Sequence, residues 1–575
     1  MLVALMATST AYATLRPEQI VVVPEKTTAQ ATEEFMTYKQ TLTGAEIGTI
    51  VKDGLGTLTV EEDYNVKSSL QVREGELYIG NGKDGEHVTI LAQPHVAGSP
   101  TISVGGKNAS LVLDNATYKY YISDSKGNRG YSSAIAIGNL DGAGSIELRN
   151  GSTLTAAQSF FAYNNACADH VQASYSDKKG DTLYTGGDHT KRSQLVVSGA
   201  SKAQAGMTFY FADIDISISG EGSIFEDGVR AIDGNAGWLG DDDGSGATDV
   251  VTNVTISDGG TWTSRHDLKT SAATTATTNI LVTGNGSSFN SNRTTYFGYA
   301  GANGTTNLTV EKGAVANIVD MNVGVAAGTE TVNIAINDKT STLNAGKMVV
   351  NQGGTITNNG KIALSDKVKV TSWRDDSIMG LGDKKAEVSE TVAKGIEIAG
   401  GKLINNGTVE GDIVMSSGSV TLLHDSKTGA ITATSGTLSV LGDVVFNGDI
   451  MLSNTGFLFT DGATIDLQGN DFSFDGGSIT IVVNAATPVM AVFSLEEEEM
   501  LASYGITFKN AGTVTGFEDD IEVTIVTMDA EGQITETGTY ILKSSDVTVQ
   551  SIPEPTTATL SLLALAGLCA RRRRK

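Results

Sequence analysis

A short pattern of alternating apolar and polar positions recurs along most of the chain. In each copy an apolar-x-apolar triplet is followed by a turn rich in glycine or asparagine, then by serine or threonine and another small strand-like segment. Alternation sends every second side chain to one face of a strand, and Gly and Asn accept the positive φ of a sharp corner. The pattern therefore predicts short strands joined by tight turns. The triplets and their turns are 146–148 before 150–152, 195–197 before 198–200, 216–218 before 220–223, 254–256 before 258–261, 280–282 before 284–287, and 308–310 before 312–314.

The spacing of the triplets predicts a repeat protein. Their first residues lie 21 to 49 residues apart, which we interpret as one or two multiples of a period in the twenties, typical of a solenoid. The Asn-Asn-Gly motif of 354–362 returns in 401–409 at an offset of 47 residues, interpreted as two turns. Asn side chains stacked at such corners are expected to form amide ladders. A second element that ends in glycine is seen at 77–80, 136–138, 296–298 and 322–324.

The alternation of strand triplets and glycine-rich turns resembles the passenger β-helix of autotransporter-type proteins. The resemblance covers the larger part of the chain. With the repeat spacing, it leads us to expect an all-β fold: a right-handed parallel β-helix (β-solenoid) with a small C-terminal β-rich domain and a C-terminal hydrophobic helix.

The flanks of the repeat region differ from it in pattern. A strand at 21–23 and a short amphipathic helix at 30–42 are expected to cap the first repeat, because an open sheet edge would pair with another chain. Near the other end we expect a strand at 478–483 and a helix at 494–501 with serine at its N-cap. The predicted segments are a signal peptide (1–13), an N-terminal cap (14–48), the β-solenoid (49–476), a small β-rich domain (477–550) and a sorting signal (551–575).

The first residues have the features of a shortened signal peptide. An apolar run at 2–7 precedes Ala11-Tyr12-Ala13, an A-x-A site after which a signal peptidase would cut. Export from the cytoplasm follows from this interpretation, and an ordinary buried strand is the alternative.

The last residues combine a kink motif, an apolar helix and a basic cluster. Pro553 and Pro555 block helix propagation around Glu554, and the apolar segment 556–570 follows. As a helix it would be about 22 Å long, short of a roughly 30 Å hydrocarbon core, so we expect a transient transmembrane anchor. The tail resembles a PEP-CTERM sorting signal, which implies processing by an exosortase-type enzyme in a Gram-negative envelope. The anchor's basic cluster is Arg571, Arg572, Arg573, Arg574 and Lys575.

Composition excludes some functions. The chain has 67 Gly and 7 Pro, and such an abundance of small residues suits tight turns between strands. Its net charge is −26, which excludes nucleic acid as a partner because phosphate repels an acidic surface. Its two cysteines, Cys167 and Cys569, give no disulfide framework or thiolate metal site.

The sequence holds no recognisable catalytic motif. The six histidines lack metal or triad spacing, and no HExxH, GxSxG or phosphate-binding loop occurs. We therefore expect no enzyme. A polysaccharide lyase or hydrolase remains the alternative, because in 213–215 two acids alternate with an apolar residue and are expected to face outward together. The weighed residues are Asp213, Asp215 and Glu221, and the pairs Asp188 with His189 and His266 with Asp267.

A glycine-rich acidic loop is the one candidate for a metal. Asp241, Asp243 and Asp249 could supply oxygen ligands to Ca²⁺, although the spacing is not that of an EF-hand. A plain solvated loop is the favoured interpretation, so no cofactor is expected.

Five aromatic residues are candidates for a carbohydrate-stacking surface, with core or edge packing as the favoured role. They are Trp238, Trp262, Tyr296, Phe297 and Tyr299.

Together these features predict an exported structural or adhesive protein of the cell surface or extracellular matrix. The expected partners are an exosortase-type enzyme, the inner membrane through the tail, and exopolysaccharide or host glycans. An autotransporter passenger is a third interpretation, disfavoured by the kind of tail with which the sequence ends.

Overall fold

The computed structural model is all-β over the part of the chain that it describes. That part contains one short 3-10 helix, η2 (Ser544–Asp546), and no α-helix. Within the same ranges no helix has the length and apolarity needed to cross a bilayer. The described residues are 19–22, 50–61, 63–66, 70–92, 100–120, 134–138, 142–156, 159–162, 192–205, 208–211, 213–227, 236–239, 250–271, 275–299, 303–326, 328–371, 386–390, 395–484, 504–528 and 534–551.

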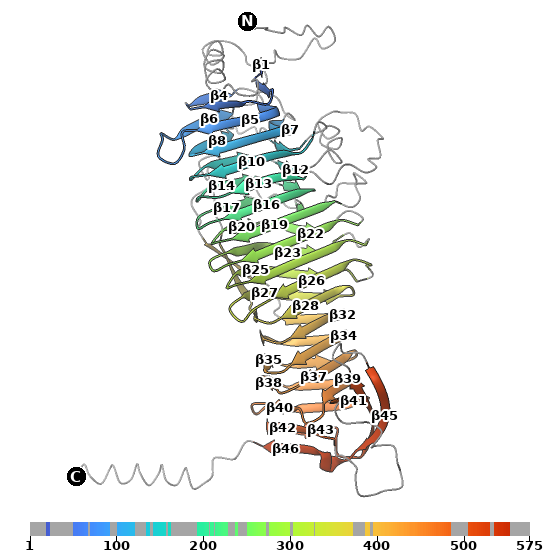
Figure 1. Cartoon of the computed structure of the whole chain (residues 1–575). Helices are drawn as coiled ribbons and strands as arrows, with labels where there is room; N and C mark the ends of the chain where they lie inside the picture. Colours follow the sequence, from blue (N-terminus) through green and yellow to red (C-terminus); the bar gives the residue numbers. More distant parts are fainter. Residues whose placement is uncertain are drawn as a thin grey trace, which may run out of the picture. The chain divides into compact units, whose positions relative to one another are not determined.

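The chain divides into two compact units. Unit 1 comprises Met1–Gly346 and Asp366–Val392, and unit 2 comprises Lys347–Ser365 and Ala393–Lys575. In each unit the strands follow one another in a ladder-like succession (Figure 1). Strand β27 (Thr342–Asn351) contributes residues to both units.

Apart from the antiparallel pair β30 (Lys367–Thr371) and β31 (Ala386–Glu390), the described strands of unit 1 pair in parallel within three columns, which we call A, B and C. The chain visits A, then B, then C before it returns to A. Column A contains β3 (Thr57–Val60), the end of β5 (Leu70–Gly80), the end of β7 (Pro100–Asp114), β10 (Gly144–Arg149), β13 (Ser193–Val197), β16 (Ile214–Ser219), β19 (Val251–Ser257), β22 (Thr277–Thr283), β24 (Thr305–Glu311) and β26 (Thr331–Ile336).

Columns B and C complete each repeat of unit 1. Column B contains β4 (Tyr64–Val66), β6 (Val88–Ala92), β8 (Ala116–Tyr120), β11 (Thr153–Ala156), β14 (Lys202–Ala205), β17 (Ile224–Asp227), β20 (Thr261–Ser264) and the first halves of β23 (Ser288–Phe297) and β25 (Val315–Val323). Column C contains β1 (Gln19–Val22), β2 (Ile50–Asp53), the starts of β5 and β7, β9 (Ala134–Ile137), β12 (Ser159–Ala162), β15 (Thr208–Phe211), β18 (Ala236–Leu239), β21 (Asp267–Thr270) and the second halves of β23 and β25.

The core of unit 1 is built from the apolar positions of the predicted triplets. In β19, β22 and β24 buried and half-buried residues alternate along the whole strand. The register pairs Val254 with Ile280 and Ile280 with Leu308, and all three side chains are at most 2% exposed. Apolar side chains at the same position of successive strands therefore stack on one another and form a continuous row that is removed from water. This burial stabilises each repeat through its neighbours.

The register confirms the predicted triplets but corrects their period. Ile146 pairs directly with Leu195, and Ile216 pairs directly with Val254. The long steps are therefore single repeats, lengthened by residues on either side of the column C strands, and not pairs of repeats. The second predicted element lies in column C at 136–138, 296–298 and 322–324, whereas 77–80 belongs to column A.

The turn from column A to column B explains the glycine and asparagine of the motif. Asp258 and Gly259 have φ of 53° and 89°, and the Gly260 N–H donates to the Ser257 carbonyl at 2.9 Å. Two successive left-handed residues define a type I′ turn. The Gly259 N–H also donates to the buried Ser287 hydroxyl of the next repeat at 3.0 Å, which accounts for the serine that follows the turn.

Unit 2 has its own three columns, called D, E and F. Column D contains β28 (Gly354–Asn358), the ends of β32 (Gly395–Asn405) and β34 (Ile413–Leu423), β37 (Thr437–Leu441), the ends of β39 (Ile450–Thr460) and β41 (Phe472–Asn484), and β44 (Ile521–Met528). Column E contains β29 (Lys361–Leu364), β33 (Thr408–Glu410), β35 (Ser426–Thr428), β38 (Val444–Phe446), β40 (Thr464–Asp466), β42 (Ile506–Ala511) and β46 (Val547–Ser551). Column F contains the end of β27, the starts of β32, β34, β39 and β41, β36 (Ile431–Ala433) and β43 (Val514–Thr515).

The repeated Asn-Asn-Gly motif of unit 2 also spans a single repeat. Asn358 pairs with Asn405, and its Nδ2 donates to the Asn405 Oδ1 at 2.8 Å, which confirms the expected amide ladder. The offset of 47 residues is one step because 366–392 intervenes. That insertion contains the antiparallel pair β30 (Lys367–Thr371) and β31 (Ala386–Glu390).

The ends of the repeat region differ from the sequence expectation in one respect. The boundary placed at residue 477 lies inside β41, whose parallel pairing with β39 continues through Val482. The strand predicted at 478–483 is present as part of β41, and β44 forms an antiparallel hairpin with β45 (Ile534–Leu542). The strand expected at 21–23 overlaps β1. The helices expected at 30–42 and 494–501 lie outside the described residues.

Candidate functional site

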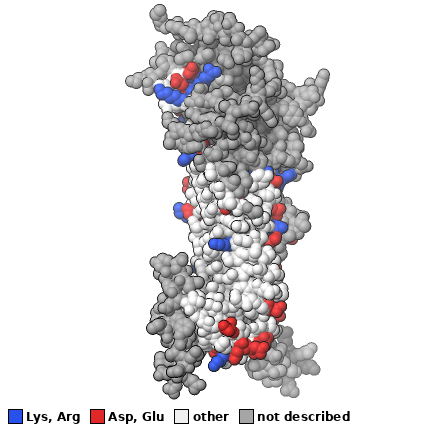
Figure 2. All heavy atoms as spheres, turned by 90° about the vertical axis from the view of Figure 1, so that its right-hand side faces the viewer, with Lys and Arg blue, Asp and Glu red and all other residues white. Residues whose placement is uncertain are grey.

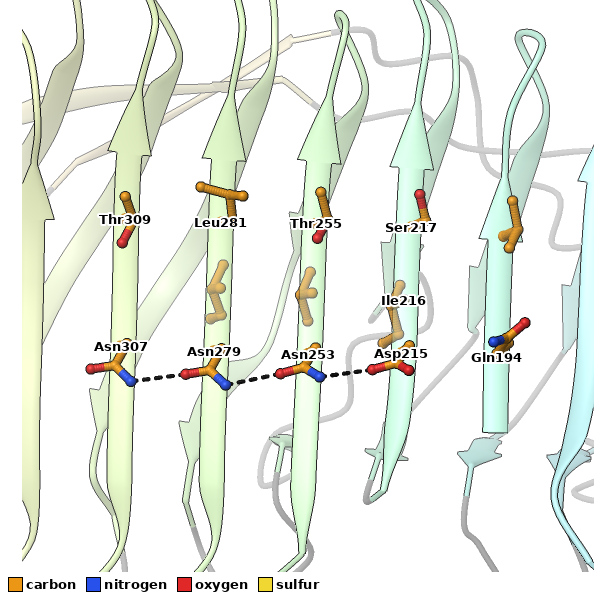
Figure 3. A pocket seen from close by; sticks show the side chains of 13 residues that line it. Gln194, Asp215, Ile216, Ser217, Asn253, Thr255, Asn279, Leu281, Asn307 and Thr309 are labelled. Atoms are coloured by element: carbon orange, nitrogen blue, oxygen red, sulfur yellow. Dashed lines mark hydrogen bonds between the residues drawn. The ribbon is translucent and has the colours of Figure 1, made fainter. Parts of the chain in front are cut away.

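A hollow of about 710 Å³ lies over the outer face of column A. Figure 3 shows its side chains in two rows that run across neighbouring strands of unit 1. The residues that line it are Gln194, Val196, Asp215, Ile216, Ser217, Asn253, Val254, Thr255, Asn279, Ile280, Leu281, Asn307 and Thr309.

The first row, which we call the amide row, is a directed hydrogen-bonded ladder (Figure 3). The Nδ2 of Asn253 donates to the Asp215 Oδ1 at 2.7 Å, and the Nδ2 of Asn279 donates to the Asn253 Oδ1 at 2.9 Å. Asn307 donates to Asn279 at 2.8 Å, and Asn333 extends the ladder with a bond to Asn307 at 3.0 Å. All four bonds point the same way, towards the carboxylate.

The second row lies two residues further along each strand. It consists of Ser217, Thr255, Leu281 and Thr309, which are all half-buried (Figure 3). Pleating puts these residues on the same face as the amides, because residues i and i+2 of a strand share a face. The hollow thus offers hydroxyls and short apolar groups beside a line of amides.

Asp215 is the only ionisable residue among the described residues that line the hollow. Its carboxylate forms an ion pair with Arg192 at 2.9 Å. A hydrolase of glycosidic bonds works with two carboxyl groups, one on each side of the bond. The described lining contains one such group, Asp215.

The expectation that Asp213 and Asp215 face outward together is wrong. Asp213 is fully buried with φ of 49°, and its Oδ1 accepts the Val251 N–H at 2.7 Å. It sits just before β16, where the left-handed backbone turns the chain into the strand, so the alternation begins only at Ile214. Glu221 lies in the exposed turn after β16.

A cluster of buried polar residues lies in column B of unit 1, next to the start of column C. Glu226 and Arg265 form an ion pair in which neither side chain is more than 8% exposed. The Asp227 carboxylate accepts hydrogen bonds from the Ser264 hydroxyl at 3.1 Å and the Trp262 Nε1 at 3.3 Å. Burial, with a smaller contribution from the Glu226 charge, raises the pKa of Asp227 to about 8.

The histidine pairs weighed from the sequence contribute no accessible site in the described structure. His266 is fully buried at the edge of that polar cluster, while Asp267 begins β21. Asp188 and His189 lie outside the described residues, as do Asp241, Asp243 and Asp249. Within the described ranges no group of three potential metal ligands is present.

The five aromatic residues do not form one surface. Trp262 and Phe297 are buried, and Trp262 packs edge-to-face on Phe225 at 4.8 Å between ring centroids. Tyr296 and Tyr299 meet edge-to-face at 5.6 Å, and the Lys269 ammonium lies 4.0 Å from the centre of the Tyr299 ring. For Trp238 only the backbone, in β18, is described.

The amide row was missed by the sequence analysis, although a signal for it was present. An Asn or Asp comes immediately before the predicted apolar triplets of β16, β19, β22 and β24, and Asn333 has the same place in β26. Aligning the triplets would have placed these residues in one line. The two terminal signals, with Ala11, Ala13, the Pro553–Pro555 motif and the basic cluster 571–575, lie outside the described residues.

Comparisons with known proteins found no counterpart. No family model, curated protein or solved structure matches this chain. In the view of Figure 2 the described surface carries few charges over its middle, with a group of mixed sign near the upper end and an acidic group near the lower end. The function must therefore be argued from the chain's own residues.

Proposed function

We propose that this protein is an exported structural or adhesive β-solenoid of the cell surface or extracellular matrix. The observation that carries the proposal is the register of column A, where each outward position is repeated on the next strand at the strand spacing of about 4.8 Å. A parallel β-helix built in this way presents the same outward position on each successive strand, as with Asn253, Asn279 and Asn307. Such a surface suits attachment to a repeating partner.

The two termini support delivery to the outside of the cell. The A-x-A site at Ala11 and Ala13 fits removal of a signal peptide, and the Pro553-Glu554-Pro555 motif with its apolar segment and cations fits a sorting tail. In this proposal an exosortase-type enzyme acts at the motif while the tail is held transiently in the inner membrane, with 571–575 on its cytoplasmic side.

The test follows the full chain in a Gram-negative cell that carries an exosortase-type system. The wild type is expected to become accessible to protease added outside the cell. A variant with Pro553→Ala, Glu554→Gln and Pro555→Ala is expected to stay with the inner membrane. Equal accessibility of both forms would contradict sorting through this motif, and a wild type that stays in the cytoplasm would contradict export.

The second candidate function is a polysaccharide-active enzyme, favoured only by Asp215 within the hollow. It is separated from adhesion by incubating the purified full chain with bound polysaccharides and analysing the supernatant. Adhesion predicts no new reducing ends or unsaturated sugars. Their release by the wild type and not by Asp215→Ala would replace the proposal with an enzyme.

A further inference from the structure

We propose that the hollow over column A binds a neutral polysaccharide, laid along the amide row so that successive sugar units meet successive strands. The inference rests on the proposed adhesive function in one respect, that the protein meets polysaccharide outside the cell. It goes further in assigning the site, the direction of the chain across the strands and the charge class of the ligand.

Asp215 sets the direction of every amide in the row. A carboxylate only accepts hydrogen bonds, so Asn253 must present its Nδ2 to Asp215 and its Oδ1 to Asn279. The same orientation passes to Asn307 through the next bond. Each amide then keeps a second N–H and a second lone pair, and no protein partner for that N–H is found in the described part of the chain. These groups are already ordered, so little side-chain entropy is lost on binding.

The charge of the lining selects a neutral ligand. Among the described lining residues Asp215 alone is ionisable; it is paired with Arg192 at 2.9 Å, and the other members are amides, hydroxyls and apolar groups. An acidic polymer would also meet a molecule of net charge −26. Sugar hydroxyls donate and accept at once, which matches amides that offer both functions.

The dimensions of the hollow suit several sugar units. Its lining spans five strands from β13 to β24, which is four strand spacings or about 19 Å. Leu281 and the methyl groups of Thr255 and Thr309 lie beside the amides, where they can contact the C–H face of a sugar ring. Weak contacts at each strand add up along one chain, because every contact after the first is intramolecular.

The test measures affinity of the full chain for neutral polysaccharides (dextran, mannan and galactomannan) and for acidic ones (alginate and hyaluronan) by affinity electrophoresis. The wild type is expected to be retarded by at least one neutral polymer and by neither acidic one. Asn279→Ala is expected to weaken that binding about tenfold, because it removes an amide from the middle of the row and frees its neighbours.

Asn317→Ala is the matched control. Asn317 donates to Asn290 at 2.8 Å and accepts from Asn344 at 2.8 Å in a ladder of the same kind outside the hollow, so the variant also loses two ladder bonds but leaves the amide row intact. Its affinity for the polysaccharide is expected to stay within about twofold of the wild type. Such a change is smaller than the change in affinity expected from the loss of one neutral hydrogen bond to the ligand. Equal losses in both variants would assign the effect to stability and overturn the inference.

Leu281→Trp provides a second variant that leaves the ladder intact. Leu281 is half-buried on the outer face, so a larger side chain fills the hollow rather than the core. The variant is expected to lose binding while its melting temperature stays near the wild type. Unchanged binding, or a wild type that binds only acidic polymers or none, would overturn the inference. A surface-exposed protein that binds nothing would defeat this inference alone, whereas one retained in the cytoplasm would defeat the proposed function.

Discussion

The buried Asp227 shows how one residue can make the stability of unit 1 sensitive to pH. Its carboxyl is fully buried beside Trp262 and Ser264, and burial raises its pKa to about 8 from an ordinary value of 3.8. The folded chain therefore binds one more proton than the unfolded chain between about pH 4 and pH 8. The free energy of unfolding must fall as the pH rises through this window, by at most about 1.4 kcal/mol per pH unit from this group.

Asp227→Asn is expected to remove that slope. The amide mimics the neutral carboxyl, so the variant should be more stable than the wild type at pH 8, with the difference shrinking towards pH 4. Urea unfolding of unit 1 at pH 4, 6 and 8 checks this. Asp258→Asn is the control, since Asp258 is exposed in a turn. A wild-type slope unchanged in Asp227→Asn would show that another group titrates.

Residues of this kind are the hardest to predict from sequence. Asp213 and Asp215 read alike in the sequence, yet one is buried under a left-handed corner and the other lines the hollow. The difference is set by where the strand begins, which depends on pairing with β13 and β19. Local alternation carries no information about a partner 21 or 38 residues away.

At the scale of elements, the turn from column A to column B is short and of nearly constant length from β10 to β25. Its glycines serve two purposes, a positive φ and a close approach to the next repeat. A Cβ on Gly259 would lie 3.2 Å from the backbone of Glu221, whereas a Cβ on Gly151, in the equivalent turn, would meet nothing within 4 Å. Substitutions at the two positions therefore separate the free-energy cost of a positive φ from the cost of a steric clash with the neighbouring repeat.

Gly151→Ala is expected to cost about 1–2 kcal/mol of folding free energy, the usual cost of a left-handed conformation. Gly259→Ala should cost more, because the turn that carries Glu221 must also move. Thermal unfolding of the two variants measures the difference. Equal losses of stability in the two variants would mean that the backbone at this turn shifts to relieve the clash at little cost in free energy.

The positions of the strands were predicted more accurately than the pairing between them. The apolar triplets appear as strands because alternation and glycine turns are local properties. The assignment of two repeats to the long steps was wrong because insertions lengthen a repeat without changing its register. The amide row was within reach of the sequence, since Asn253, Asn279 and Asn307 each precede a triplet.

At the scale of the whole molecule, each unit has its own stacked core. Ile280 in unit 1 and Leu438 in unit 2 are both fully or nearly fully buried on strands paired on both sides. In such arrays stability is close to a sum over repeats and their neighbours. Damage to one core is thus expected to remain local.

Ile280→Ala and Leu438→Ala are each expected to cost about 2–5 kcal/mol. Hydrogen exchange followed by mass spectrometry should show faster exchange in unit 1 for the first variant and in unit 2 for the second. The reciprocal unit serves as the internal control in each case. Loss of protection throughout both units in either variant would show a single cooperative transition instead.

The regular turn between columns A and B has a consequence for how this chain can vary. From β10 onwards that turn stays short, while the chain lengthens repeatedly beside column C, as between β12 and β13. A guest peptide grafted after Ala162 would add to a position where length already varies, whereas one grafted at Asp258 would push neighbouring repeats apart. The turns between columns A and B thus keep a nearly constant length, while the segments beside column C accept insertions. This makes the protein a suitable scaffold for displaying foreign peptides.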